Sequence, residues 1–176
     1  MLLSKRFLKI AMLGMALCGP LASAQASDRQ FFQSIEGRWT GPGEIVAGKY
    51  KGTRFSCSLD GSSLGRNPGM TLDGKCRVGI FSQRITATVE RRGRSYRGTF
   101  LDGAEGKGLD VVSGNVSGNR VTVGMKREQL NGAMVASMKP NGNLGVTVSV
   151  RIGEELVPVI GLDLSKVDGI ATGSVR

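Results

Sequence analysis

Apolar and polar residues alternate along most of the chain with the period of two that is typical of β-strands. The clearest case is 144–151, where leucine and valine at the even positions alternate with glycine, threonine, serine and arginine. Such segments recur at intervals of about 10 to 12 residues, which favours a β-sandwich or a β-barrel. After a first strand near Trp39, the predicted strands are 54–59, 70–78, 83–90, 95–101, 110–116, 120–125, 133–138, 144–151 and 156–164.

Short turn-forming sequences separate several of these segments. The predicted turns are Asp-Gly at 60–61 and 102–103, Gly-Asn at 118–119, Asn-Gly at 131–132 and Pro-Asn-Gly-Asn at 140–143. Hairpin connections favour an up-and-down meander, and closing the meander would leave no exposed strand edge. We therefore predict an all-β fold, a single antiparallel up-and-down β-barrel of about eight to ten strands with a short N-terminal helix. Pro158 should lie at an edge or a bulge of the last strand.

Residues 1–24 have the composition of a secretory signal peptide. Lys5, Arg6 and Lys9 precede an apolar run at 10–19, and small residues at 22–24 form a cleavage site. The apolar run is too short to cross a hydrocarbon layer of ~30 Å, so we expect no integral membrane span. A short lysine- and arginine-rich leader is typical of bacteria, which predicts a periplasmic protein.

Residues 25–36 are predicted to form a helical lead-in, and residues 37–176 the barrel domain. Ser27 and Gln30 have the spacing of a capping box at the start of a helix. Phe31, Phe32 and Ile35 then fall on one helical face, which we expect to pack against the barrel mouth.

Two cysteines remain after the leader, Cys57 and Cys76, and both fall in the inward phase of their predicted strands. An even number of cysteines in an exported chain favours a disulfide. The bridge would close a loop of about 20 residues and contribute ~3 kcal/mol. Two buried free thiols are the alternative.

The chain contains no histidine, which excludes Ser-His-acid and Cys-His catalysis, most zinc sites and the usual haem ligand. The acidic residues that could form a catalytic pair lie beside predicted turns, where solvated charges are common. We therefore predict no catalytic residue, no cofactor and no metal. The acidic residues in question are Asp102, Glu105, Asp110, Glu154 and Glu155.

The net charge is +10 for the whole chain and +7 without the three basic residues of the leader. The densest basic cluster lies at 91–97, where four arginines flank a predicted hairpin turn beside Tyr96. Guanidinium groups bind phosphate and carboxylate well, so we consider an anion-binding site there. Export makes a lipid headgroup or an acidic envelope polymer a better partner than nucleic acid, and a solvated turn is the alternative. The candidate residues are Arg91, Arg92, Arg94 and Arg97.

Gly37-Arg38-Trp39, placed after a short helix and before a series of strands, resembles the Gly-x-Trp opening of lipocalins and other calycin-like barrels. The resemblance implies that Trp39, with Gly37, forms a structural seal at the closed end of the barrel. The same layout is similar to that of the small bacterial inhibitors of secreted metalloproteases, which also have one disulfide. That second resemblance implies that the segment 25–33 enters a protease cleft.

These observations predict a monomeric, non-enzymatic envelope protein that binds an amphipathic or anionic ligand or a partner protein. The alternative is an inhibitor or interaction module that uses the N-terminal segment. The barrel interior separates the two hypotheses, because an open apolar lumen favours a ligand carrier and a filled lumen favours an interaction scaffold.

Overall fold

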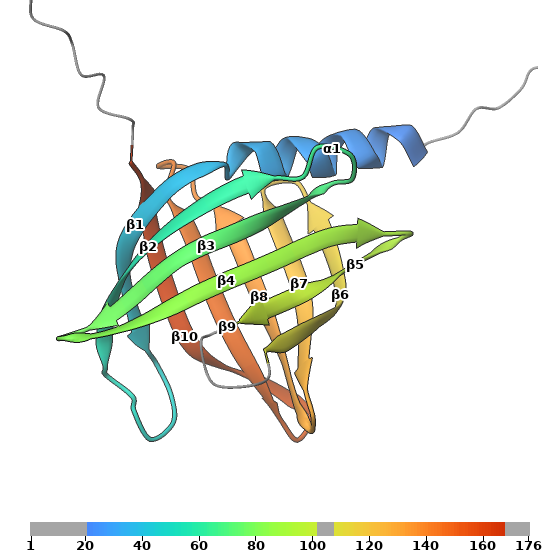
Figure 1. The fold of residues 1–176 in the computed structure, drawn as a ribbon. Helices are drawn as coiled ribbons and strands as arrows, with labels where there is room; N and C mark the ends of the chain where they lie inside the picture. Colours follow the sequence, from blue (N-terminus) through green and yellow to red (C-terminus); the bar gives the residue numbers. More distant parts are fainter. Residues whose placement is uncertain (1–20, 102–107, 168–176) are drawn as a thin grey trace, which may run out of the picture.

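Ten antiparallel strands close into a barrel in the computed structural model, which describes residues 21–101 and 108–167 (Figure 1). Each strand pairs with the next along the chain, and β1 (Gly37–Ile45) closes the ring by pairing with β10 (Glu155–Lys166). The predicted fold class, an up-and-down barrel with one short helix, is confirmed. The strands between β1 and β10 are β2 (Arg54–Ser63), β3 (Gly69–Val78), β4 (Phe81–Arg92), β5 (Ser95–Leu101), β6 (Leu109–Ser117), β7 (Arg120–Arg127), β8 (Leu130–Met138) and β9 (Leu144–Ile152).

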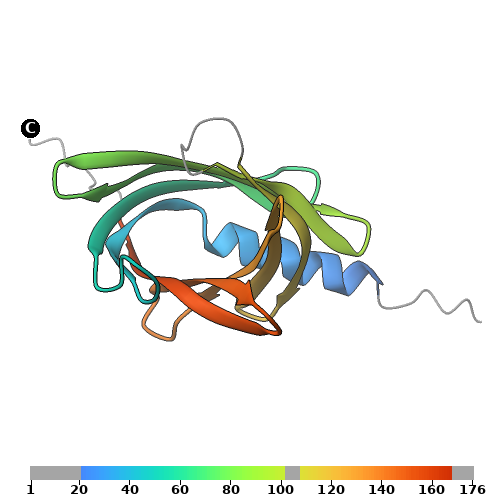
Figure 2. The same cartoon turned by 90° about the horizontal axis from the view of Figure 1, so that it is seen from below.

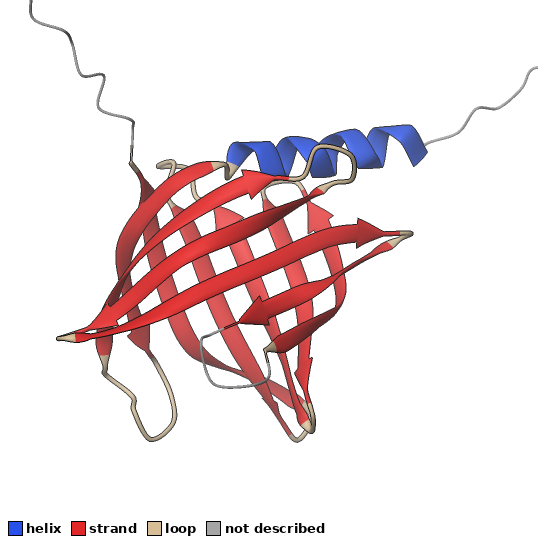
Figure 3. Ribbon diagram, viewed as in Figure 1, coloured by secondary structure: helices blue, strands red, loops and turns tan. Residues whose placement is uncertain are grey.

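The helix α1 (Leu21–Ser34) lies across one end of the barrel (Figures 1 and 3). From the opposite end the strands form a ring, with α1 behind it (Figure 2). The helix begins at Leu21, so the prediction that Ser27 caps its start is wrong. The residues at 21–26 are mostly alanine, leucine and glutamine, which extend a helix readily. Residues 1–20 of the predicted leader lie outside the described residues. In the described part, no helix is both long and apolar enough to cross a membrane.

Two of the predicted turns are wrong. Asp60 and Gly61 lie inside β2, where they pair with Asp73 and Leu72 of β3. The Asn-Gly pair at 131–132 lies inside β8, and the actual turn comes three residues earlier at 128–129. In both places continued strand pairing outweighs the local turn preference. The turns at 118–119 and 140–143 are confirmed, and 102–103 lies outside the described residues.

Glycine and proline let the strands bend into the closed ring. A Cβ atom on Gly98 of β5 would overlap the carbonyl oxygen of Thr88 on β4, so only glycine allows this close approach. In β10 the register shifts between Pro158 and Ile160, which places Pro158 at a bulge, as predicted.

Candidate ligand-binding site

The barrel encloses an apolar cavity of about 530 Å³. This volume lies in the range of small-molecule binding sites in proteins. Among the described residues, Gln83 is the one lining residue with a polar side chain, and the others are aliphatic, aromatic or sulfur-containing. All ten strands contribute to the lining, as does the C-terminal end of α1. The interior is therefore an apolar chamber that is not filled by the protein's own side chains.

On several strands the lining residue near α1 is more buried than the lining residue nearer the other end of the barrel, whereas the three lining residues of β7 are all buried. On β10, Leu164 near α1 is 1% exposed, whereas Ile160 nearer the other end is half-buried. Solvent therefore reaches the chamber at the end opposite α1, which we call the open end. The same order holds on β1, β2, β4 and β9 for the pairs Trp39 and Ile45, Leu59 and Phe55, Val89 and Ile85, and Leu144 and Val148.

Aromatic and aliphatic side chains close the other end, which we call the sealed end. Phe31, Phe32 and Ile35 at the end of α1 are buried, and the Phe32 ring lies 5.6 Å from that of Tyr96. Trp39 is buried beside them and donates an indole N–H hydrogen bond of 3.0 Å to the carbonyl oxygen of Ile35. The structure thus places Trp39 at the sealed end, where the calycin resemblance expects a plug.

A hydrogen-bonded cluster fastens α1 to the barrel. Asp28, which is 6% exposed, accepts a 2.5 Å bond from the Arg91 guanidinium and a 2.6 Å bond from the Tyr96 hydroxyl. Burial and the neighbouring Asp28 carboxylate raise the pKa of Tyr96 well above its ordinary value. Tyr96 therefore stays a neutral donor, and the buried carboxylate has the partners that it needs. We call Asp28, Arg91 and Tyr96 the helix lock.

A second polar contact holds the link between α1 and β1. The Glu36 carboxylate accepts hydrogen bonds from the hydroxyl and the backbone N–H of Ser63 at the end of β2. These bonds lower the pKa of Glu36, so its carboxylate stays charged down to acidic pH. Gly37 follows with a φ of 100°, a backbone conformation that favours glycine.

The predicted anion site lies on the β4–β5 hairpin next to the sealed end. Arg91 belongs to the helix lock, and Arg92 forms a 2.6 Å ion pair with Glu90. Arg97 donates hydrogen bonds to backbone carbonyl groups, one of them that of Val112 on β6. Arg94, at the hairpin turn, is exposed. Three of the four arginines thus have partners within the chain, and anion binding at this hairpin stays a prediction.

Cys57 and Cys76 lie directly opposite each other on β2 and β3. Their sulfur atoms are 1.97 Å apart, at disulfide distance. Cys57 is buried and Cys76 lines the cavity, which agrees with the inward phase that the alternation predicts. The bridge ties together two strands of the cavity wall.

The segment 25–33, which the inhibitor resemblance places in a protease cleft, lies within α1. Three of its side chains, those of Asp28, Phe31 and Phe32, are buried against the barrel of the same molecule. In this arrangement the segment stabilises the protein's own fold, and its entry into a protease cleft stays a prediction.

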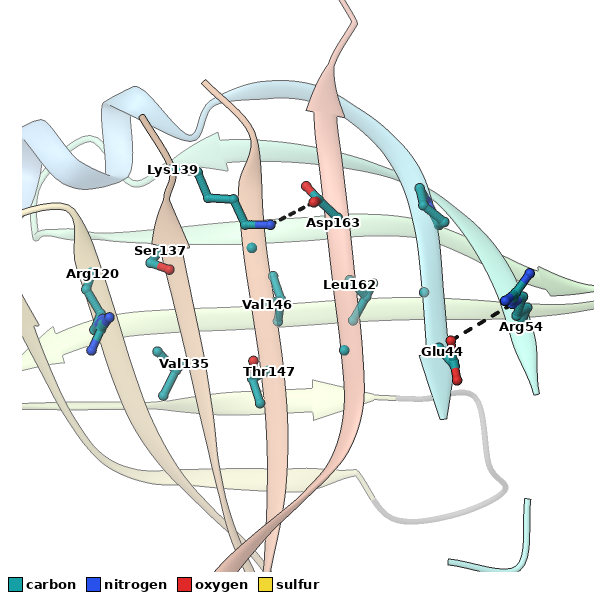
Figure 4. A pocket seen from close by; sticks show the side chains of 14 residues that line it. Glu44, Arg54, Arg120, Val135, Ser137, Lys139, Val146, Thr147, Leu162 and Asp163 are labelled. Carbon is teal, nitrogen blue, oxygen red and sulfur yellow. Dashed lines mark hydrogen bonds and ion pairs between the residues drawn. The ribbon is translucent and has the colours of Figure 1, made fainter. Parts of the chain in front are cut away.

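A second, wider depression of about 760 Å³ lies on the outer face of β8, β9, β10 and β1 (Figure 4). Four of its five charged side chains form ion pairs, Lys139 with Asp163 at 2.7 Å and Arg54 with Glu44 at 3.9 Å, and the fifth is Arg120. In the described part of the chain, no group of three or more acidic, cysteine or histidine residues could hold a metal ion. The enclosed lumen is therefore the better candidate site.

No known protein-family model matches the chain, and no curated protein matches it in sequence. In its fold the chain is similar to the crystal structure of Rv2717c from M. tuberculosis. The two share 13% sequence identity with a TM-score of 0.57, over 80% of this chain and 98% of that chain. At this level of identity the likeness shows the barrel fold alone.

The main element of the site that the sequence did not reveal is the helix lock. Asp28 is separated from Tyr96 by 68 residues, and no motif links the two. The open end had one local signal, the apolar pair Ile80-Phe81 at a hairpin turn, where polar residues are usual.

Proposed function

We propose that this protein binds an amphipathic small molecule, with the apolar part of the ligand inside the barrel and its polar group at the open end. The observation that carries the proposal is the unfilled apolar chamber behind a sealed end and a solvent-accessible mouth. Gln83, exposed at the mouth, is the lining side chain that can hydrogen-bond to a polar head group. The Gly-x-Trp resemblance to calycin-like barrels agrees with such a role.

A pair of neighbouring substitutions on β9 tests this proposal. Val148 lines the lumen, whereas Thr147 lies on the outer face and borders the outer depression. Val148→Phe should fill part of the chamber and weaken binding of a dansyl-labelled fatty acid about ten-fold or more, since the displaced ligand loses its apolar contacts. Thr147→Phe adds a ring on the outside and should leave binding unchanged.

Fluorescence titration measures how tightly each variant binds the labelled fatty acid. Unchanged binding by Val148→Phe would place the ligand outside the lumen, and a loss confined to Thr147→Phe would point to the outer depression. Solvent extraction of the purified protein should, in addition, release a lipid-like molecule that mass spectrometry can identify.

We further propose that the protein is exported to the periplasm and acts without catalysis. The leader-like residues 1–24 and the cysteine pair at disulfide distance support export. The N-terminal residue of the purified protein tests it, since processing at the predicted site would leave Gln25 first.

A further inference from the structure

Large apolar side chains gather at the open end of the barrel. Of the eleven exposed large hydrophobic residues among those described, nine lie at this end, and the other two are Val112 and Val167. Ile80 is 90% exposed and Phe81 76% exposed, values far above those expected for residues that merely border a core. The nine residues are Val46, Tyr50, Val78, Ile80, Phe81, Leu101, Leu130, Ile152 and Leu156.

The β3–β4 hairpin differs from the other tight turns of the barrel. In the described part of the chain five hairpins have two-residue turns, and four of them have polar or charged residues beside glycine or in its place. The β3–β4 turn is Gly79-Ile80, followed directly by Phe81. This hairpin projects outward from the barrel wall (Figure 1), so its apolar tip has no neighbour from the barrel to cover it.

Positive charge surrounds these apolar tips on one side of the open end. The loop and strand start at 46–54 and the hairpin at 75–84 contain six basic residues and no acidic residue. Because β2 pairs with β3, these two segments lie next to each other, and we call them together the basic edge. The hairpins on the far side of the mouth carry acidic residues at 128, 154 and 155 beside their basic ones. The basic residues of the edge are Lys49, Lys51, Arg54, Lys75, Arg77 and Arg84.

We propose that the basic edge docks on the surface of a membrane that contains anionic lipid. Exposed apolar and aromatic tips insert between lipid headgroups, while lysine and arginine beside them contact the phosphates. The edge combines both features, with Tyr50 between Lys49 and Lys51, and with Ile80 and Phe81 between Arg77 and Arg84. Two of the six cations, Arg54 and Arg84, also have acidic partners on the barrel wall.

Docking in this orientation would bring the mouth of the apolar chamber to the membrane surface. A lipid could then pass between the bilayer and the lumen with little exposure of its chain to water. This transfer step rests on the proposed function, whereas the docking itself does not. The two are separable, because a variant with a defective edge should still bind a lipid probe in free solution.

Vesicle co-sedimentation tests the docking. Protein purified from cells that express the full chain should sediment with vesicles made of equal parts of phosphatidylcholine and phosphatidylglycerol, and far less with phosphatidylcholine alone. The double variant Ile80→Ser/Phe81→Ser should reduce this binding about ten-fold or more, because it removes the inserting side chains. Val112→Ser, which replaces an exposed valine on the outer wall, is the matched control and should bind like the unmodified protein.

Charge reversal provides the second arm of the test. Lys49→Glu/Lys51→Glu should abolish the preference for anionic vesicles, and added salt should weaken binding of the unmodified protein. Arg94→Glu, on the hairpin near the sealed end, should have little effect. Unchanged binding by the Ile80→Ser/Phe81→Ser variant, equal losses from Arg94→Glu, or dimerisation that buries the tips without vesicles would overturn the proposal.

Discussion

The two ends of the barrel are built from the same strands but present opposite surfaces. At the sealed end apolar side chains are covered by α1, and the buried carboxylate of Asp28 has two close donors. At the open end apolar side chains such as Ile80 are exposed, and the chamber behind them is unfilled.

The difference indicates that the two ends of the barrel have separate roles. Burial and paired polar groups at the sealed end stabilise the fold. Exposed apolar surface contributes little to stability in water, so its concentration at the open end fits a role in recognition. Matched substitutions at the two ends should therefore change the free energy of unfolding by very different amounts.

The largest contrast should come from the same substitution at each end. Phe32→Ala removes a ring that is 2% exposed and should lower the free energy of unfolding by about 3 kcal/mol. Phe81→Ala removes a ring that is 76% exposed and should change it by less than about 0.5 kcal/mol. Urea unfolding followed by circular dichroism measures both. Equal losses of unfolding free energy in the two variants would show that the open end is as much a part of the stabilising core as the sealed end.

The disulfide should give the next largest effect. Replacing Cys57 and Cys76 by alanine removes a link across a sequence separation of 19 residues and should cost about 3 kcal/mol of unfolding free energy. Thiol titration of the denatured, unreduced protein should find no free thiol in the mature chain. Two free thiols would refute the bridge.

A substitution in the helix lock should show how much more a buried ion pair contributes to stability than an exposed one. Asp28→Asn leaves the Arg91 guanidinium, which is 16% exposed, without its counter-charge and should cost about 2 kcal/mol. Asp73→Asn at the open half breaks the pair with Arg84, whose side chains are 58% and 72% exposed, and should leave the urea midpoint unchanged. A similar shift in both variants would contradict the assignment of Asp28 to a stabilising lock.

The sequence predicted most of the fold because barrel strands carry their own signal. Period-two alternation located the strands and the facing phase of Cys57 and Cys76, since each depends on residues a few positions apart. The turns at 60–61 and 131–132 were predicted wrongly because Asp-Gly and Asn-Gly express only a local preference. Pairing along whole strands overrides that preference.

The site was less accessible to sequence reasoning. Asp28, Arg91 and Tyr96 meet only after the barrel closes, so no spacing in the chain marks them as partners. Whether a lumen is open or filled depends on the volumes of some two dozen side chains from ten strands, as well as on their apolar character. The sequence indicated the character of these residues, but the empty volume emerged only with the three-dimensional arrangement.

The smallest expected effect concerns how the stability that the sealed end provides depends on pH. Because the pKa of Tyr96 is raised in the folded protein, its contribution to stability is complete below its unfolded pKa of about 10 and falls as the pH rises above that value. Tyr96→Phe loses the hydrogen bond to Asp28, at a cost of about 1 kcal/mol near neutral pH.

The variant should also lose the part of the alkaline decline that Tyr96 causes. Urea midpoints measured from about pH 8 to about pH 11 should therefore converge for the two proteins at the alkaline end. Parallel curves would show that Tyr96 ionises as easily in the folded barrel as in the unfolded chain. The sealed end would then be more open to water than its burial indicates.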